Sequence, residues 1–570
     1  MKVVLLSEGT KVRQGEPINE LTQLDLTCGK NDSCAFQIML FPEHDAVLTL
    51  DHNPCFHPAG NTTNYRLHLF IENSSVEITL YSEQFFKDDQ NIQTADLLMP
   101  FLPVHLKKGV PEVLWAELKV PAHTPPGTYR GELVLTSHTM FSAEKKEQIL
   151  PFTLCVKNVT LPAPADHTFY LNLWQHNSNI ARKHEVPLWS DAHFEIIARY
   201  LQTLADLGQK AITIIASEIP WSGQYGFLDS YENQDFYEYN MISVTKNKDG
   251  SFSYDYSIMQ RYIDLCFQYG IQEKIEIIGL CSIWSKEEYG FGAVAPDYPD
   301  AIRIRYFDQT DQCYHYMSRG SEIKAYIRSL QDYLIRRNLI DRVIVSADEP
   351  ADSQQFHKSI QALKDCAPAF SIKAALNHVE FVEEHEEELS AIAPCLHYAV
   401  EKLDFLKNAA AQHRTFVTWY VCCIPDYPNT FLRSPLCEAR LIPILNYYLG
   451  LDGFMRWNYT VWPNHPRSDI RAKYPEWSAG ETNFVYPSRG GYPLLSLRYM
   501  ALKRGISDYE LLKMAEAKCP QILQEVYHRL FSMESLSDFY KNSDTRPYSL
   551  NYDDYQAAKL LLLQALEASD

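Results

Sequence analysis

Short runs in which apolar and polar residues alternate recur through the N-terminal part of the chain. Residues 46–50, 66–70 and 76–80 are examples, and turn-rich stretches separate them. A pattern that repeats every two residues matches a strand, in which successive side chains point to opposite faces. Each run therefore predicts a half-buried β-strand. Several such strands predict an all-β sandwich over residues 1–160. The proline-rich stretch 161–164 is typical of a linker, because proline cannot donate to a β-ladder.

After this linker, apolar runs of strand length alternate with amphipathic helical patterns. The eight expected strands are residues 168–174, 211–216, 274–280, 342–347, 371–376, 396–400, 415–420 and 453–457. Helices expected between them include residues 193–207, 322–336 and 437–449. Eight β-α repeats predict an α/β fold, a closed (β/α)8 TIM-like barrel over residues 161–516, with an open doubly wound sheet as the alternative.

The chain ends in helical patterns at residues 509–518, 521–531 and 555–568. We therefore expect residues 517–570 to form a C-terminal helical segment after the barrel. The hydrophobic content of 46% is sufficient for large buried cores in a chain of 570 residues.

The overall charge argues against two classes of partner. There are 52 Lys and Arg against 72 Asp and Glu, a formal net charge of -20. A negative field repels phosphate backbones and anionic lipid headgroups, so we expect no nucleic-acid partner and no membrane partner. The charge is compatible with a neutral substrate. The composition does not indicate an oligomeric state.

The N-terminal residues and the cysteines suggest a compartment. The first residues, MKVVLLSEGTKVRQG, lack the apolar run of about 7–15 residues that a secretory signal needs. The 13 cysteines are scattered and form no CxxC pair, which is typical of reduced thiols. These observations predict a cytoplasmic protein.

The adjacent acids Asp348 and Glu349 follow the expected strand 342–347 directly. Active sites of barrels form at the C-terminal ends of the strands, where mutual repulsion and burial raise the pKa of at least one of two neighbouring acids. A carboxyl group that keeps its proton near neutral pH suits general acid catalysis. The alternative is an ordinary helix N-terminus with Pro350 in its first turn, and the spacing alone does not decide between the two.

Other expected strand ends are rich in aromatic, amide and basic side chains. These candidates are Trp174, His176, Trp221, Trp284, Trp419, Tyr420, Arg456, Trp457, Asn458, Tyr459 and Trp462. A single tryptophan is more often a packing residue, but aromatic faces at most strand ends favour a carbohydrate site.

Several other chemistries have little support. His378 and His385 flank an acidic stretch at a spacing that does not match HExxH, so a solvated helical face is the better explanation. The neighbouring Cys422 and Cys423 have no second pair for a zinc site and are expected to be free thiols. Motifs for nucleotide binding and serine hydrolysis are missing, so neither a cofactor nor a metal ion is expected.

Five stretches of the chain invite comparison with a known family. They are LNLWQHNSNIARKHEVPLWSDAH, SADEP, WYVCCIPDYPNTFLRSP, LDGFMRWNYTVWPNHPRSDIRAKYPEWSAGETNFVYP and SLRYMALKRGISDYELL. Together they span roughly residues 165–515 and occur in the expected order, so the chain resembles the DUF4091 and glycoside hydrolase family 123 group. The characterised members of that group are β-N-acetylgalactosaminidases, and a preceding sandwich is usual in it.

The resemblance implies a retaining, substrate-assisted mechanism, in which the 2-acetamido oxygen of the substrate attacks C1 and forms an oxazolinium intermediate. It implies that Glu349 is the general acid and then the base, and that Asp348 accepts the acetamide N–H. Asn377 is a weaker candidate for substrate binding. Glu481 stands where many relatives have Asp, which affects the expected choice of sugar. An adjacent pair needs a bend at the strand end to aim both carboxyl groups at one sugar.

Two alternatives remain open at this stage. One is a glycosidase of the same fold that acts on N-acetylglucosamine or a non-acetylated hexoside. The other is a non-catalytic carbohydrate-binding protein, which the intact acidic pair argues against.

Overall fold

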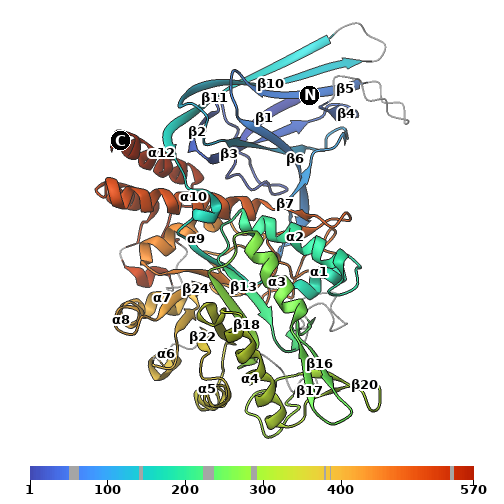
Figure 1. The fold of residues 1–570 in the computed structure, drawn as a ribbon. Helices are drawn as coiled ribbons and strands as arrows, with labels where there is room; N and C mark the ends of the chain where they lie inside the picture. The colour runs from blue at the N-terminus through green and yellow to red at the C-terminus, as the bar shows by residue number, and fades with distance from the viewer. Residues whose placement is uncertain are drawn as a thin grey trace.

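The computed structural model describes residues 1–50, 63–139, 145–221, 237–283, 292–377, 380–385, 387–533, 535–539 and 545–569. In Figure 1 a two-sheet β-domain lies at the top, a barrel surrounded by helices lies below it, and α10 (Leu497–Lys518) and α12 (Tyr552–Ser569) lie between them. The predicted fold class, a TIM-like barrel after an N-terminal β-rich region, is confirmed. The limits at residues 160 and 516 stay a prediction, and α10 continues through residue 516 without a break.

The N-terminal domain has two sheets. The first has the order β1 (Lys2–Ser7), β3 (Asp32–Phe41), β9 (Glu112–Val120), β6 (Glu77–Lys87) and β7 (Gln93–Pro100). The second has the order β2 (Asp25–Lys30), β11 (Lys145–Thr160), β10 (Gly127–Thr139), β5 (Thr63–Ile71), β4 (Ala46–Thr49) and β8 (Val104–Leu106). Alternate residues such as Phe36, Ile38 and Leu40 fill the core between the sheets, as the two-residue pattern requires.

The barrel is one parallel sheet of eight strands. Its order is β12 (Tyr170–Leu173), β25 (Gly453–Arg456), β24 (Phe416–Tyr420), β23 (Ala391–Pro394), β22 (Ser371–Leu376), β21 (Val343–Asp348), β18 (Lys274–Cys281) and β13 (Ala211–Ile215). Side-chain hydrogen bonds help to join the two outer strands. The Gln175 backbone N–H donates to the Thr213 hydroxyl over 3.2 Å, and the Thr213 backbone N–H donates to the Gln175 side-chain oxygen over 2.9 Å. The barrel is therefore nearly closed.

The predicted sixth strand, residues 396–400, is wrong. The strand at this place is β23, and residues Leu396–Glu401 form helix α7. Leu396, Ala399 and Val400 are the buried residues of this segment, a spacing of three and four that is helical. β23 has only four residues and ends in Pro394, so its pattern is too short to stand out.

The remaining elements surround the barrel. The helices are α1 (Asn177–Lys183), α2 (Asp191–Ala205), α3 (Ser257–Gln268), α4 (Gly320–Arg336), α5 (Ser353–Cys366), α6 (Glu380–His385), α8 (Leu403–His413), α9 (Leu436–Leu449) and α11 (Ile522–Leu530). A four-stranded sheet has the order β17 (Phe252–Asp255), β16 (Ser243–Lys246), β19 (Arg305–Asp308) and β20 (Cys313–Tyr316). Two short pairs are β14 (Ile219–Pro220) with β15 (Tyr237–Glu238), and β26 (Tyr486–Pro487) with β27 (Pro493–Leu494).

One side chain of α6 corrects a second expectation. His385 is only 5% exposed, so the acidic stretch that ends at this histidine is not simply a solvated helical face. His378 lies outside the described residues, as does Trp284.

The N-terminal domain and the barrel share one apolar core. Met39 and Trp115, on the outer face of the first sheet, belong to the same buried cluster as the barrel side chains. Buried ion pairs cross this boundary from α10. The Arg498 guanidinium donates to the Asp96 carboxylate over 2.8–3.1 Å, and the Arg504 guanidinium donates to Glu117 over 2.7 Å.

Replacing Asp96 with Asn is expected to destabilise the whole protein. Arg498 is 1% exposed, and the variant would leave its charge without a counter-ion, a change that costs about 3–5 kcal/mol in buried pairs. Denaturant unfolding of the two proteins measures the difference. The matched control is Glu77→Gln. Glu77 pairs with Lys119 over 3.8 Å on the surface, where both side chains are exposed, so the control should lose only about 0–1 kcal/mol of stability. Equal losses in the two variants would contradict this account of the boundary.

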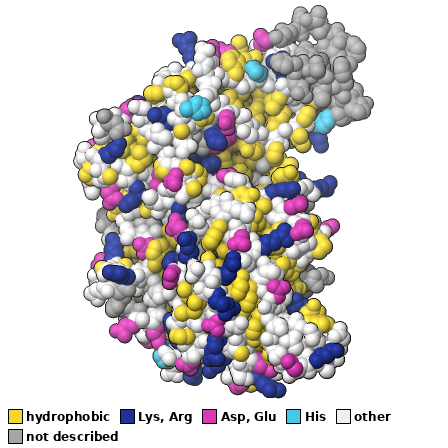
Figure 2. Space-filling view, viewed as in Figure 1, with side chains coloured by type: hydrophobic (Ala, Val, Ile, Leu, Met, Phe, Trp, Pro, Cys, Tyr) yellow, Lys and Arg dark blue, Asp and Glu magenta, His cyan; other side chains and the backbone are white. Residues whose placement is uncertain are grey.

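The surface, the thiols and the helices add three observations. Acidic and basic side chains are interspersed over the face shown in Figure 2, so the net negative charge is not gathered in one area of that face. Each cysteine within the described ranges is a free thiol. None of the described helices is both long and apolar enough to cross a bilayer.

Candidate active site

A cavity of about 260 Å³ opens at the C-terminal ends of the barrel strands. Its wall is formed by Trp174, Trp221, Asp348, Glu349, Ala375, Tyr420, Cys422, Cys423, Met455, Trp457, Glu476, Trp477 and Glu481. Many of these residues lie at or just after the ends of different barrel strands, although they are far apart in the sequence. This rim is where a TIM barrel carries its active site.

Glu349 lies in this wall with two side-chain partners. The Tyr420 hydroxyl donates to its Oε1, and the Asn377 amide donates to its Oε2 over 3.4 Å. Burial, followed by the charge of Glu349, raises the pKa of Tyr420 well above its usual value, so the tyrosine keeps the proton that it donates. The pair therefore fixes the orientation of the Glu349 carboxyl group.

Asp348 is the second carboxyl group of the wall. The Trp221 indole N–H donates to its Oδ2 over 3.1 Å. Burial, together with the neighbouring Glu349, raises the pKa of Asp348 to about 7, and the indole hydrogen bond opposes this rise. Asp348 can therefore change its protonation near neutral pH.

The backbone bends at this pair, as the sequence requires if both side chains are to reach one cavity. Glu349 has a φ of 40°, a left-handed conformation that is strained for a residue with a side chain. Its N–H donates to the Ala375 carbonyl over 3.2 Å, and the Asp348 N–H donates to the Ser282 carbonyl over 3.0 Å. The neighbouring strand β18 is irregular at the same level, where a Cβ on Gly279 would lie 2.3 Å from the Ser217 hydroxyl.

Tryptophans form much of the remaining wall. Trp174 and Trp221 stack with ring centroids 6.1 Å apart, and Trp457 packs edge-on against Trp477 at 5.7 Å. The Trp174 indole N–H donates over 3.2 Å to Glu276, a carboxylate buried in the barrel below the cavity. Ring faces held in this way can pack against the C–H faces of a sugar.

Some predicted residues contact the residues of the cavity wall but do not line the cavity themselves. The His176 Nε2–H donates to the Trp457 carbonyl over 2.7 Å, and the Asn377 amide donates to Glu349. Arg456 is 0% exposed and donates to the carbonyls of Glu481 and Val421, so it positions two wall segments without lining the cavity.

Four other predicted residues lie in the core and do not line the cavity. Trp419 donates to Asn446 in α9 over 2.8 Å, since it alternates along the strand with Tyr420, which faces inward. Tyr459 pairs with the Thr203 hydroxyl at 2.7 Å, and the Trp462 indole donates to the Val485 carbonyl over 2.7 Å. Asn458 is likewise fully buried and outside the cavity wall.

The sequence reasoning missed several wall residues. Glu476 and Trp477 lie on the long segment after β25, so a rule based on strand ends does not find them. Cys422 and Cys423 follow the end of β24 after one intervening residue, and their Sγ atoms are 3.6 Å apart. Their place at the strand end is the signal that could have identified them.

Glu481 is in the cavity wall although its residue is 0% exposed. Burial, followed by the nearby Cys423, raises the pKa of Glu481 to about 8, while Arg456 opposes this rise. The raised pKa favours the protonated form of the carboxyl group near neutral pH, and both of its oxygens are buried.

An aromatic-walled cavity with two adjacent carboxyl groups on a barrel rim defines the class of a carbohydrate-active hydrolase. The family described as "Glycoside hydrolase 123, catalytic domain" matches residues 174–515. The chain therefore belongs to glycoside hydrolase family 123 and is a glycosidase that acts on a carbohydrate, which confirms the resemblance seen in the sequence.

Among the similar solved structures, one supports the fold. The chain is similar to a family 123 glycoside hydrolase from Clostridium perfringens, at 17% identity and a TM-score of 0.73, over 100% of this chain and 97% of that one. A bacterial Ig-like domain containing GH10 xylanase from termite gut matches 78% of this chain and 95% of its own at 10% identity, with a TM-score of only 0.31. A comparison with curated proteins found no match.

Proposed function

We propose that this glycosidase is an exo-acting, retaining β-N-acetylgalactosaminidase that uses the 2-acetamido group of its substrate as the nucleophile. The acetamide oxygen attacks C1, the bond from C1 to the leaving oxygen breaks, and Glu349 protonates that oxygen. Water then attacks C1 of the oxazolinium intermediate, and Glu349 takes the proton from the water. The acetamide is restored, and the sugar is released with its original anomeric configuration.

The observation that carries this proposal is the bend that brings Asp348 and Glu349 into one cavity wall. Residues on an ordinary strand would point to opposite faces, so the strained conformation of Glu349 serves the site rather than the sheet. Two carboxyl groups on the same side of a sugar suit a mechanism in which one moves protons and the other steers the acetamide.

The pKa of Asp348 supports its assigned role. At about 7, the group is largely ionised above neutral pH and can accept the acetamide N–H as a carboxylate. The positive charge that develops on the oxazolinium ring stabilises this ionised form further, because opposite charges close together favour each other in a buried site. Asp348 would thus bind the transition state more strongly than the ground state.

The size of the cavity supports exo action on a single terminal sugar. At about 260 Å³ it lies just below the range of roughly 300–1,000 Å³ that is usual for drug-sized ligands. The similar family 123 enzyme from Clostridium perfringens hydrolyses glycolipid glycans, which is consistent with a terminal sugar as the substrate.

Glu481 favours a second candidate, a glycosidase of the same mechanism with a different sugar preference. It stands in the wall where the resemblance leads us to expect the shorter Asp, and it is protonated near neutral pH. A longer side chain in this place alters which sugar hydroxyl can be bound, so an N-acetylglucosaminide is the main competing substrate.

A panel of aryl β-glycosides tests the proposal. We expect kcat/KM to be highest for the N-acetylgalactosaminide and lowest for hexosides with a 2-hydroxyl group. A preference for the N-acetylglucosaminide would change the sugar assigned to the site but leave the proposed mechanism intact. Faster hydrolysis of the 2-hydroxyl sugars would contradict the mechanism, and thermal stabilisation by sugars without any turnover would contradict catalysis itself.

A further inference from the structure

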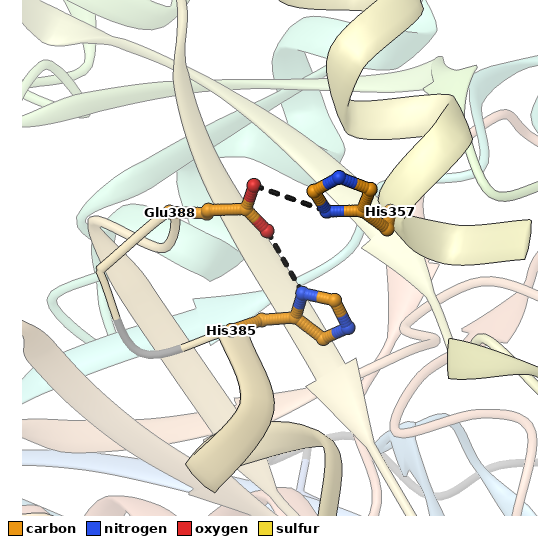
Figure 3. A group of neighbouring side chains, drawn as sticks. All are labelled: His357, His385 and Glu388. Carbon is orange, nitrogen blue, oxygen red and sulfur yellow. Dashed lines mark hydrogen bonds and ion pairs between the residues drawn. The ribbon is translucent and has the colours of Figure 1, made fainter. Parts of the chain in front are cut away.

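A cluster of two histidines and a glutamate lies on the outside of the barrel, away from the cavity. Figure 3 shows Glu388 between the rings of His357 and His385. The Glu388 Oε2 is 2.8 Å from His385 Nδ1, and its Oε1 is 3.3 Å from His357 Nδ1. One potential ligand atom from each residue lies within 4.8 Å of the others. The cluster joins α5, which carries His357, to the end of α6 and the residues that follow it.

His385 has a polar neighbour on each side of its ring. The Ser353 hydroxyl donates to the Glu384 carboxylate, and its oxygen lies 3.0 Å from His385 Nε2. On the other side, His385 Nδ1 faces the Glu388 carboxylate at 2.8 Å.

His357 also favours a metal site, because its Nδ1 approaches the other oxygen of the same carboxylate. Two imidazole nitrogens therefore converge on one carboxylate, a set of donors that suits a divalent transition metal ion.

We propose that His357, His385 and Glu388 form a binding site for a divalent transition metal ion, with zinc as the best fit. Imidazole nitrogens and a carboxylate are usual zinc ligands, and bonds of about 2.0–2.2 Å in a tetrahedral site separate neighbouring ligand atoms by roughly 3.3 Å. The His385 and His357 nitrogens lie 2.8 and 3.3 Å from the two oxygens of Glu388, which is close to this value. Ser353 supplies the outer hydrogen bond that orients a histidine ligand.

The site is accessible from solvent. The His357 side chain is 53% exposed and that of Glu388 is 24% exposed, so an ion can enter and keep a water molecule as its fourth ligand. The ion would join α5 to the segment after α6. Since α5 begins at Ser353, soon after the loop with Glu349, we expect the ion to stabilise this part of the barrel.

Zinc titration of the full-length protein, after treatment with a chelator, tests this proposal. Calorimetry should show one ion per chain at this site, and zinc should raise the melting temperature. His357→Ala should weaken binding by more than about tenfold, because loss of a direct ligand exceeds the effect of losing an outer hydrogen bond. The matched control is His315→Ala, which removes an exposed histidine paired with Asp311 and should bind zinc as the wild type does.

Glu388→Gln gives a second variant that keeps the size of the side chain, and it should also lose binding. Equal zinc affinity in wild type, His357→Ala and Glu388→Gln would overturn the proposal. Cobalt distinguishes this site from Cys422 and Cys423, which lie near Glu481 in the cavity. The proposal expects cobalt absorption without thiolate charge-transfer bands, and strong charge-transfer bands in the wild type would overturn it. None of these outcomes depends on the substrate of the enzyme.

Discussion

Glu349→Gln is expected to lower kcat/KM by about 10²–10⁴-fold on substrates with poor leaving groups, which is the usual contribution of general acid–base catalysis. The amide cannot protonate the leaving oxygen, although it still fits beside Tyr420 and Asn377. On a dinitrophenyl glycoside, whose leaving group needs no proton, the first step should be much less affected. Steady-state and burst kinetics on both kinds of substrate measure the difference.

The matched control for this prediction is Glu476→Gln. Glu476 is another acid in the cavity wall, but it is exposed at the rim. The control should therefore keep most of its activity on both substrates. An equal loss on good and poor leaving groups in Glu349→Gln, or equal losses in the two variants, would contradict the role of Glu349 as the proton donor.

Asp348→Asn is expected to lower kcat by about 10²–10³-fold, the effect of removing one preorganised electrostatic contact from a transition state. The same variant should be more stable than the wild type at alkaline pH. The pKa of Asp348 is about 7 in the folded protein, against about 3.9 for an unperturbed Asp, so the folded state binds the extra proton between these values. Its contribution to the free energy of unfolding therefore falls as pH rises from about 4 to 7.

Melting temperatures at about pH 5 and pH 8 check this prediction. Glu481 and Glu83 also have raised pKa values, about 8 in each case, so the wild type should lose stability with pH for several reasons. The difference between wild type and Asp348→Asn isolates Asp348, and it should grow in favour of the variant at the higher pH. A difference that does not change with pH would contradict the raised pKa.

The sequence predicts the strong elements of this fold well. The strands around 211–216, 274–280, 371–376 and 415–420 lie close to their expected positions, because each is a continuous apolar run of ordinary strand length. β23 was missed, since four residues ending in proline carry too little signal and the neighbouring helix α7 is also apolar. The start of α10 was missed because the helix is buried on most sides and has no polar face to reveal its period.

The site was predictable where chemistry follows a strand directly. Asp348, Glu349, Trp174, Trp221 and Tyr420 meet this condition, and the structure brings them into one cavity. Side chains alternate along the strand, so Trp419 points into the core while Tyr420 faces the cavity. An error of one residue in the predicted strand would reverse the two orientations. The spacing of residues in the sequence could not predict the cluster of two histidines and a glutamate. His357 lies on α5, whereas His385 and Glu388 follow the next strand of the barrel.

The central claim is that the substrate's own acetamide group attacks C1. Replacing the acetyl group of an aryl N-acetylgalactosaminide with mono-, di- and trifluoroacetyl groups weakens this oxygen as a nucleophile and changes the size of the substrate little. The account predicts that kcat/KM falls steeply along the series for the wild type. A rate that stays constant across the four substrates would show that the acetamide does not attack, and would contradict the mechanism proposed for Asp348 and Glu349.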